Sequence, residues 1–410
     1  MKALVLCGAA PQIHLTECLH SRGITVVMAD MNESVVGRKY ADIFYPVSVF
    51  DSEAIKQVAI KENVDFIITV CADQVLEIVA KVSEELGLPC YISYETAQNV
   101  SRKSYMKKLF VENDIPTSRH VVLKELDLDK ISHLDYPLVV KPIDSYSSRG
   151  VSRVSTAEEM ETAFKKAKDI SRASTVVVEE FAEGEEISVD FFVEDGVANY
   201  ITSTISDKIF DQGFLIHRSR NPAIFSKELE QEIKKVGQKI ADAFGIKNSP
   251  MFAQLITDGK KLSVIEFCAR TGGSIKFRLI KNTTGFDVIK AVVDLTLGEK
   301  PNCEIKTKAG FLVNEFLYCN DGVLDHLEGF EELVREGIIK EYHQFKSNGS
   351  NVGGLRNSGD RVASFTIHVE SIEKLRENHA IANKRIKIIG TNGEDLLRHD
   401  LLSNLNEKQW

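Results

Sequence analysis

The first hundred residues alternate short apolar runs with stretches of helical length, and this rhythm constrains the fold more than any other feature. The apolar runs, which we expect to be strands, are Ala3 to Cys7, Ile24 to Ala29, Val64 to Thr69 and Leu88 to Ile92. The helical stretches run from Gly8 to about Arg22 and from Gln74 to Leu86. Alternating strands and helices build a parallel sheet with helices on both faces. The pattern therefore predicts a parallel α/β domain over residues 1–100.

After residue 100 the strands and helices lose this strict alternation, which favours an α+β arrangement. The expected strands are His120 to Leu123, Pro137 to Lys141, Val151 to Val154, Thr175 to Glu180, Ile187 to Val193, Ala309 to Phe316 and Ala363 to Val369. The expected helices are Ser104 to Asn113, Ala157 to Lys168, Lys227 to Phe244 and Ser371 to Asn383. A chain of 410 residues exceeds a single core, so we expect three domains, over 1–100, 101–304 and 305–410.

Composition and charge argue against several classes of protein. A net charge of −9 and no long Lys/Arg block argue against a general nucleic-acid binder. No run of eighteen apolar residues is present, and the first apolar run is too short for a signal peptide, so we expect no membrane association. Seven scattered cysteines without C-x-x-C spacing favour reduced thiols in a cytoplasmic protein over a zinc site.

The run from Leu262 to Gly273 brings a carboxylate and a guanidinium to the end of one buried strand. Alternation along the strand points Glu266 away from its apolar neighbours Ile265 and Phe267, and Arg270 follows four residues later. Carboxylate oxygens suit Mg²⁺, and the planar Arg fork suits phosphate or carboxylate. Taken alone, the same residues also fit a buried Glu–Arg ion pair that closes a strand.

Two hairpins carry a further set of polar residues. In the first, a buried strand delivers Lys141 and is followed by a Ser- and Gly-rich turn from Ser145 to Gly150, whose N–H groups and hydroxyls can cover phosphates. In the second, an apolar strand ends in Glu179 and Glu180 before a turn and a second strand. Strand-end backbone can read a purine edge, and a following carboxylate can accept from ribose hydroxyls. Each segment by itself also fits an ordinary solvated hairpin.

The three segments occur in the order Lys–Gly hairpin, acidic strand end and E-x-x-x-R-x-G-G strand, and in this order the sequence resembles the ATP-grasp superfamily. The resemblance is greatest to its carboxylate–amine, or L-amino acid ligase-like, branch, and it covers almost the whole chain. It implies an ATP-grasp fold with a Rossmann-like domain before the core, a small lobe at about 117–182 within the core, and a C-terminal α+β lobe.

The resemblance also implies roles for particular residues at the nucleotide. Lysines would contact the ATP phosphates, a mobile flap would close over them, an interdomain hinge would read adenine, and a carboxylate would hold the ribose. The lysines are Lys103 and Lys141, and the flap residues are Ser145, Ser148 and Gly150. The hinge residues are Glu179, Glu180, Phe181 and Ala182, and the ribose carboxylate is Glu186.

At the metal and substrate, the resemblance implies that Glu266 binds Mg²⁺ or Mn²⁺ and that Arg270 neutralises the acyl phosphate or the substrate carboxylate. Gly272 and Gly273 would allow close backbone approach. The family commonly has a second acidic metal ligand about a dozen residues earlier, and here that position holds Gln254, a neutral and weaker ligand. The position two residues after Glu266, often Asn, holds Cys268, a poor Mg²⁺ ligand.

Two further segments are candidates for substrate contact. The segment from Asp211 to Pro222 reads as a Gly- and Arg-bearing connection, in which His217, Arg218 and Arg220 could bind a carboxylate or act on an amine. A solvated loop is the equally strong alternative. The Gly-rich loop from Gly353 to Arg361, with Arg356, is the second candidate.

Together these features predict an ATP-dependent ligase that activates a small carboxylic acid as an acyl phosphate and joins it to an amine or amino acid. A relative that activates bicarbonate or formate is the enzymatic alternative, and an ATP-binding protein without turnover is the alternative that Gln254 raises. A dehydrogenase is disfavoured because the first loop lacks G-x-G-x-x-G. The expected partners are small molecules, and a homodimer is the commonest arrangement of soluble enzymes.

Overall fold

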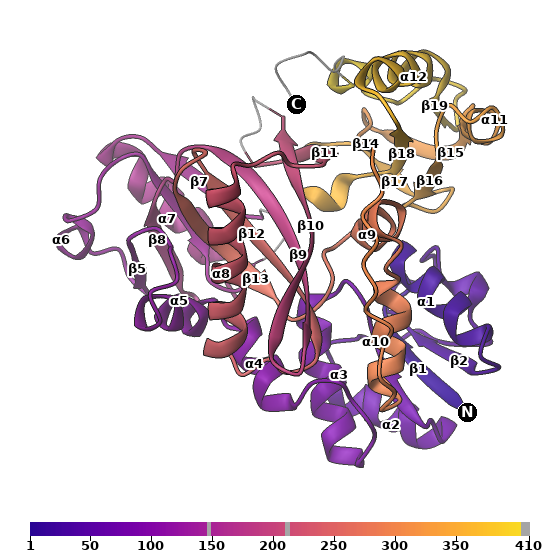
Figure 1. Ribbon diagram of the computed structural model, residues 1–410, viewed down its shortest axis with the longest axis horizontal. Helices are drawn as coiled ribbons and strands as arrows, with labels where there is room; N and C mark the ends of the chain where they lie inside the picture. The colour runs from indigo at the N-terminus through magenta and orange to yellow at the C-terminus, as the bar shows by residue number, and fades with distance from the viewer. Residues whose placement is uncertain (146–148, 210–213, 403–410) are drawn as a thin grey trace.

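The computed structural model describes residues 1–145, 149–209 and 214–402, which form four β-sheets with helices packed on them (Figure 1). Two sheets belong to the ends of the chain and two to its middle, and the largest sheet joins the middle to the C-terminal part. Within the described residues, no helix combines the length and apolar character needed to cross a membrane. The mixture of a parallel sheet with antiparallel sheets confirms the predicted α/β and α+β fold class.

The N-terminal sheet is parallel throughout and has the strand order β3-β2-β1-β4. Its strands are β1 (Lys2–Leu6), β2 (Thr25–Ala29), β3 (Ile43–Tyr45) and β4 (Phe66–Ile68). Alternation along β1 sends Ala3 and Val5 to one apolar layer and Leu4 and Leu6 to the other. The helices on the two faces are α1 (Ala10–His20) with α10 (Val288–Thr296), and α2 (Ser52–Glu62) with α3 (Asp73–Leu86). A helix from far along the chain thus completes the N-terminal domain.

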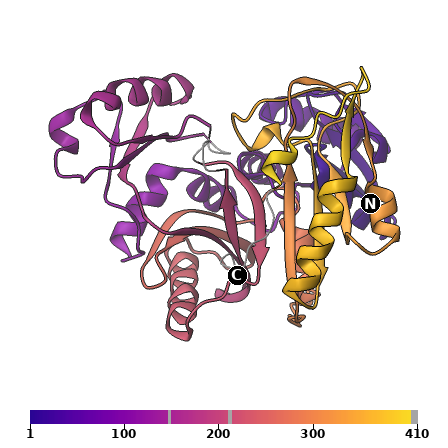
Figure 2. The same cartoon turned by 90° about the horizontal axis from the view of Figure 1, so that it is seen from above.

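A small antiparallel sheet with the order β5-β8-β6-β7 lies at the left of Figure 1, and Figure 2 shows it again on the side away from the C-terminal segment. Its strands are β5 (His120–Leu123), β6 (Leu138–Pro142), β7 (Ser152–Val154) and β8 (Val176–Glu180). The helices α6 (Leu128–Ile131) and α7 (Ala157–Ile170) complete this lobe. Met160 and Phe164 of α7 pack on Val140 and Val178 of the sheet, so one apolar layer holds the lobe together.

The largest sheet has eight strands in the order β13-β12-β9-β10-β11-β14-β18-β16, and every neighbouring pair is antiparallel. Its strands are β9 (Glu185–Glu194), β10 (Val197–Lys208), β11 (Ile216–Asn221), β12 (Ser249–Thr257), β13 (Leu262–Cys268), β14 (Phe311–Leu317), β16 (Glu341–Gln344) and β18 (Ala363–Val369). Helix α8 (Lys227–Ala243) covers the apolar face of β9, β12 and β13 through Ile233, Val236 and Ile240. The opposite face of these strands is polar and faces a cavity.

The remaining elements connect these sheets. They are α4 (Tyr94–Ser101), α5 (Lys103–Glu112), α9 (Lys276–Thr284), the C-terminal α11 (Phe330–Arg335) and α12 (Ile372–Arg385), and the short sheet β17 (Asn351–Val352), β15 (Gly322–Glu328) and β19 (Lys387–Gly390). Short 3₁₀ turns lie at Arg38–Tyr40, Ser358–Asp360 and His399–Leu401. The eight-stranded sheet crosses the boundary predicted at residues 304 and 305, because β14, β16 and β18 extend it beyond β11.

Two predicted elements differ from the structure. Residues 88–92 form no strand: the Leu88 N–H caps α3 by donating to the Ser83 carbonyl at 2.8 Å, and Tyr91 packs beneath the neighbouring core. The predicted connection before Pro222 is also wrong in part, because residues 216–221 form β11 in the middle of the large sheet. This strand gives no hydrophobic pattern in the sequence, because its buried side chains include Arg218 and Arg220, which ion pairs stabilise.

Candidate active site

A cavity of about 740 Å³ lies where the N-terminal domain, the small lobe, the large sheet and the C-terminal segment meet. Most of the residues predicted for the nucleotide and metal line it. They are Lys103, Lys141, Ser145, Glu179, Glu180, Phe181, Ala182, Glu186, Gln254, Glu266, Arg270 and Gly273. The two lysines and Glu266 therefore surround one shared space rather than separate hollows.

The polar face of the large sheet forms the floor of the cavity. Gln254 pairs in register with Glu266 on one side and with Ser188 on the other, so these three side chains form a row across β13, β12 and β9. The next row places Phe252 beside Cys268 and Asp190. Side-chain alternation explains both rows, because residues two apart on a strand lie on the same face of the sheet.

Lys103 and Glu266 form the first charged pair in the cavity. Lys103 begins α5, and its Nζ lies 2.9 Å from Glu266 Oε2 and donates to the Ser145 carbonyl at 2.8 Å. Burial favours the uncharged carboxyl form, yet the charge and hydrogen bond of Lys103 outweigh it and hold the pKa of Glu266 below its ordinary value. Glu266 is therefore an ionised carboxylate facing the cavity.

Glu179 lies between two lysines. Lys141 Nζ lies 2.5 Å from Glu179 Oε1, and Lys107 Nζ lies 2.8 Å from Glu179 Oε2. All three side chains are almost fully buried, and Lys107 follows Lys103 by one helical turn, so both point from the same face of α5. Burial opposes ionisation, but the two lysines lower the pKa of Glu179 to about 2. Sequence reasoning proposed no role for Lys107, although it lines this cavity and is almost fully buried.

The predicted adenine hinge and ribose ligand line the same cavity. Phe181 donates its N–H to the Pro137 carbonyl at 3.0 Å, which ties the hinge to the small lobe. The Glu180 carboxylate accepts from Arg119 Nε and from the Asp135 N–H, both at 2.9 Å. Glu186 contacts Lys208 at 2.8 Å and accepts from the Gln254 amide at 3.0 Å. The Gln254 side chain is thus oriented by the ribose candidate Glu186.

The predicted flap is placed in part. Ser145 lines the cavity, and its hydroxyl donates to the Arg149 carbonyl at 2.7 Å. Gly150 is buried with a φ of +80°, and a Cβ there would lie 2.8 Å from Pro142, so glycine is needed at this turn. Ser148 lies outside the described residues.

Arg270 and Lys276 gather at the end of the cavity beyond the metal candidate. Arg270 forms a two-pronged ion pair with Asp73, at the start of α3, and Lys276 lies 3.1 Å from Asp190 and donates to the Thr204 hydroxyl. The Arg270 guanidinium and the Lys276 ammonium lie 6.0 and 5.9 Å from the centre of the Phe252 ring. Gly272 packs against that ring, since a Cβ there would approach it to 2.9 Å.

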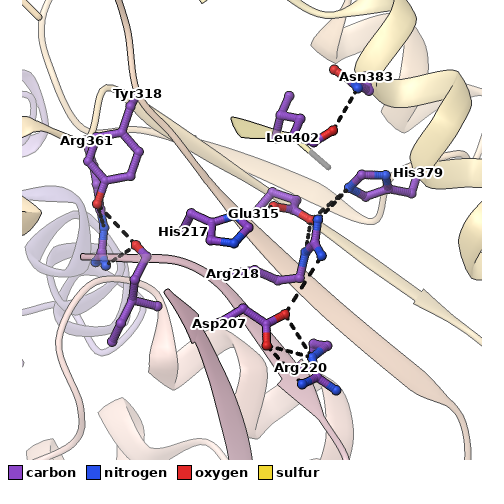
Figure 3. A network of polar contacts seen from close by, with 11 residues as sticks. Asp207, His217, Arg218, Arg220, Glu315, Tyr318, Arg361, His379, Asn383 and Leu402 are labelled. Carbon is purple, nitrogen blue, oxygen red and sulfur yellow. Dashed lines mark hydrogen bonds and ion pairs between the residues drawn. The ribbon is translucent and has the colours of Figure 1, made fainter. Parts of the chain in front are cut away.

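Four other sequence candidates lie apart from the cavity lining. Arg218 is fully buried and pairs with Glu315, and Arg220 pairs with Asp207 (Figure 3). His217 belongs to the same network, with Nδ1 4.0 Å from Glu315, and burial lowers its pKa. Arg356 is exposed and pairs with Asp360 at 3.2 Å. The cation that the Gly-rich loop does bring to the cavity is Arg361, whose guanidinium lies 3.8 Å from the centre of the Phe316 ring.

Sequence reasoning proposed no role for Asp73, Lys107 or Lys276, and it included Arg361 only as the last residue of the Gly-rich candidate loop. Asp73 lies five residues after the end of β4, at the first position of α3, where no motif marks it. Lys107 has a usable signal, because its i, i+4 spacing from Lys103 places both on one helical face. Lys276 reaches the cavity only through tertiary folding, so spacing along the chain does not reveal it.

No group of three or more His, Cys, Asp or Glu side chains with metal-binding geometry occurs in the described part of the chain. Glu266 lies in register with Gln254, and the carboxylate of the one and the amide of the other both line the cavity. Mg²⁺ often takes only one or two protein carboxylates and completes its shell with water and substrate phosphates. The residues therefore fit a Mg²⁺ ion that arrives with a nucleotide, rather than a resident metal held by protein alone.

Comparison with known proteins identifies the nucleotide-binding part. Residues 134–277 match the ATP-grasp domain family. The formate-dependent phosphoribosylglycinamide formyltransferase of Methanocaldococcus jannaschii is 25% identical over 54% of this chain and 58% of its own length. The alanine–anticapsin ligase of Bacillus subtilis is 24% identical over 53% of this chain and 50% of its own length. The chain thus spans about half the length of these curated relatives.

The fold comparison extends over nearly the whole chain. The L-amino acid ligase of Bacillus licheniformis superposes with a TM-score of 0.80 and 21% identity, covering 95% of this chain and 99% of the other. At this identity the likeness shows a shared fold.

Proposed function

Because the chain belongs to the ATP-grasp superfamily, we propose that it is an ATP- and Mg²⁺-dependent ligase that joins a small carboxylic acid to an amine or amino acid. The observation that carries this proposal is the meeting of Lys103, Lys141 and Glu266 in one cavity. Cations and a carboxylate around one space provide for a polyphosphate and its metal ion together.

The cavity has the size and charge that a nucleotide needs. Its volume of about 740 Å³ falls within the range of about 300–1,000 Å³ found for small-molecule sites. Lys103 and Lys141 would contact the phosphates, the hinge at Glu180 to Ala182 would lie along adenine, and Glu186 would accept from the ribose. Glu266, with Gln254, would hold Mg²⁺, which neutralises charge on the phosphates and polarises the phosphoryl group.

The proposed reaction has two steps. A carboxylate oxygen of the acid attacks the γ-phosphorus of ATP, so a C–O–P link forms while the bond to ADP breaks. The amine nitrogen then attacks the acyl carbon, the amide bond forms, the nitrogen releases a proton, and phosphate leaves with the electron pair of the broken C–O bond. The chain's own side chains act by positioning and by placing cations where negative charge develops.

The acid would lie at the end of the cavity formed by Arg270, Lys276 and Phe252. Asp190 and Thr204 account for two contacts of the Lys276 ammonium, which carries three N–H donors. A third donor can therefore face a substrate carboxylate beside the Arg270 guanidinium. The Phe252 ring between these cations offers an apolar surface to a small side chain.

An ATP-grasp enzyme that activates formate is the second candidate, favoured by the match to a formate-dependent formyltransferase. It shares the acyl phosphate chemistry and differs in the acid alone. Bicarbonate is the analogous one-carbon acid. An ATP-binding protein without turnover is the third candidate, because Gln254 supplies a neutral amide to the metal position.

The test is ADP release measured across pairs of amino acids, with formate and bicarbonate as alternative acids. We expect ADP and phosphate to form only with particular acid–amine pairs and Mg²⁺, and Glu266→Ala to abolish the signal. Formate- or bicarbonate-dependent ADP release would instead support the one-carbon reaction. ATP binding without ADP release from any combination would favour the protein without turnover.

We also place the protein in the cytoplasm, acting on small molecules. All seven cysteines are free thiols, as expected for a reducing compartment. The homodimer remains a prediction, which light scattering on the purified chain would test.

A further inference from the structure

Lys107 is a buried lysine in the nucleotide cavity to which the proposed chemistry gives no task. Its side chain is 4% exposed, and its Nζ contacts Glu179 Oε2 at 2.8 Å and donates to the Thr117 hydroxyl at 2.7 Å. The Thr117 hydroxyl in turn donates to the Val264 carbonyl at 3.0 Å. Lys107 is therefore linked through Thr117 to β13, the strand that carries Glu266. This link does not involve Lys141.

Lys141 has a conflict between two partners. In the structure its ammonium lies against Glu179 Oε1 at 2.5 Å, although its proposed role is at the phosphates of ATP. If Lys141 turned to a phosphate, Glu179 would lose that counter-charge while remaining almost fully buried. A buried carboxylate without a partner is strongly unfavourable, so the movement requires a second cation that stays behind.

We propose that Lys107 is this second cation, a positioning residue that keeps Glu179 neutralised and thereby releases Lys141 to the nucleotide phosphates. The inference rests on the proposed ATP-binding function and deepens it. Lys107 acts through Glu179 and Lys141 and needs no contact with the nucleotide. The proposal rests on the two lysines contacting different oxygens of the Glu179 carboxylate, Lys107 at Oε2 and Lys141 at Oε1. Lys141 can therefore leave Oε1 while Lys107 keeps its own contact at Oε2.

The electrostatics of the cluster agree with this arrangement. The charged groups that face Lys107 are Glu179 on β8, Lys141 on β6 and Lys103 on its own helix, with His120 on β5 nearby. Burial lowers the pKa of Lys107 to about 8, with Glu179 opposing and the two lysines assisting that shift. Lys107 is charged below this pKa and loses its charge above it, whereas the lowered pKa of Glu179 keeps that carboxylate ionised throughout.

The test compares Lys107→Met, Lys107→Arg and the matched control Lys108→Met by calorimetric binding of ATP and of adenosine. Lys108 is the next residue of α5, with a side chain that is 65% exposed and paired with Glu112. We expect Lys107→Met to weaken ATP binding by about tenfold, the middle of the range for members of one ion-pair network. Adenosine binding should be unchanged, because adenosine has no phosphates to draw Lys141. Lys107→Arg should restore ATP binding, and Lys108→Met should have no effect.

A double-mutant cycle with Glu179→Gln tests the route of the effect. Without the carboxylate charge, Lys141 is free already, so Lys107→Met should add little in the Glu179→Gln background. Equal losses in both backgrounds would mean that Lys107 contacts the phosphates itself, and equal losses for ATP and adenosine would mean a structural role. Either result overturns the proposal.

The pH profile supplies a measurement that does not depend on the folding of Lys107→Met. Wild-type affinity for ATP should fall as the pH rises from about 7 to 9, and Lys107→Arg should flatten that fall because arginine stays charged. Identical profiles for the two proteins would contradict the proposal. A wild-type chain that binds no ATP at all would instead contradict the proposed function.

Discussion

Several buried carboxylates among the described residues are paired with cations, and two clusters of such pairs lie on different strands, one on β8 and β9 and the other on β11 and β14. In the first cluster, Glu179 pairs with Lys107 and Lys141, and Asp190 pairs with Lys276. In the second cluster, Glu315 on β14 contacts Arg218 on β11 and His379 on α12, whose Nε2 lies 2.8 Å away (Figure 3). The second cluster links β11 and β14 to α12, so we assign it to the stability of the fold rather than to catalysis.

Replacing Arg218 should therefore destabilise the fold. Arg218→Met leaves the fully buried Glu315 short of its main counter-charge, and we expect unfolding by urea to show a loss of about 3–5 kcal/mol. The matched control is Arg385→Met on α12, whose pair with Glu336 is exposed and should be worth less than about 1 kcal/mol. Equal effects from the two variants would contradict this interpretation of the network.

Lys276 gives a prediction about the substrate end of the cavity. Lys276→Met removes the proposed contact with the acid, so the KM for the acid should rise by about tenfold to a hundredfold, the effect of one charge-assisted hydrogen bond. The KM for ATP should stay the same. Steady-state ADP release checks both, with Lys281→Met as the control, because Lys281 is an exposed residue of α9 paired with Asp287. A rise in the KM for ATP alone would remove Lys276 from the acid site.

The sequence predicted elements well where one apolar pattern settles the structure. The strand ending at Cys268 and the helix ending at Gly87 were both predictable, the second because Gly87 adopts a φ of +66° that favours glycine at a helix end. Strand β11 was not predictable, since its buried Arg218 and Arg220 have the pattern of a surface loop. The contacts of Lys276 and Asp73 depend on strands and helices far apart in sequence, which local patterns do not encode.

Helix α8 and strand β9 depend on a glycine at their contact. A Cβ on Gly237 would lie 2.4 Å from the Phe191 ring, which is itself fully buried. Gly237→Ala should destabilise the protein by about 1 kcal/mol or more, because overpacking costs about 1–3 kcal/mol and exceeds the gain in helix propensity. Thermal unfolding measures the difference, and Lys235→Ala on the exposed face of α8 is the control. A stabilised Gly237→Ala variant would show that Phe191 moves freely.

At the scale of the whole molecule, the cavity forms because segments that are far apart in sequence pack against one another. Helix α10 completes the N-terminal sheet, Arg270 reaches Asp73 in that domain, and the eight-stranded sheet carries the C-terminal segment to the rim. The small lobe supplies Lys141 from β6 and Glu179 from β8, and this lobe lies on the side of the molecule away from the C-terminal segment (Figures 1 and 2). A nucleotide bound here would contact the small lobe and the large sheet at once, so its binding should couple their positions.

The most direct test of this account is a crystal structure with Mn²⁺ and a non-hydrolysable ATP analogue. We expect an anomalous Mn²⁺ peak about 2.2 Å from the Glu266 carboxylate, close to the distance for Mg²⁺, with Lys103 and Lys141 on the phosphates and adenine along residues 180–182. A nucleotide bound elsewhere, or a metal ion away from Glu266 with the lysines still paired to Glu266 and Glu179, would contradict the account.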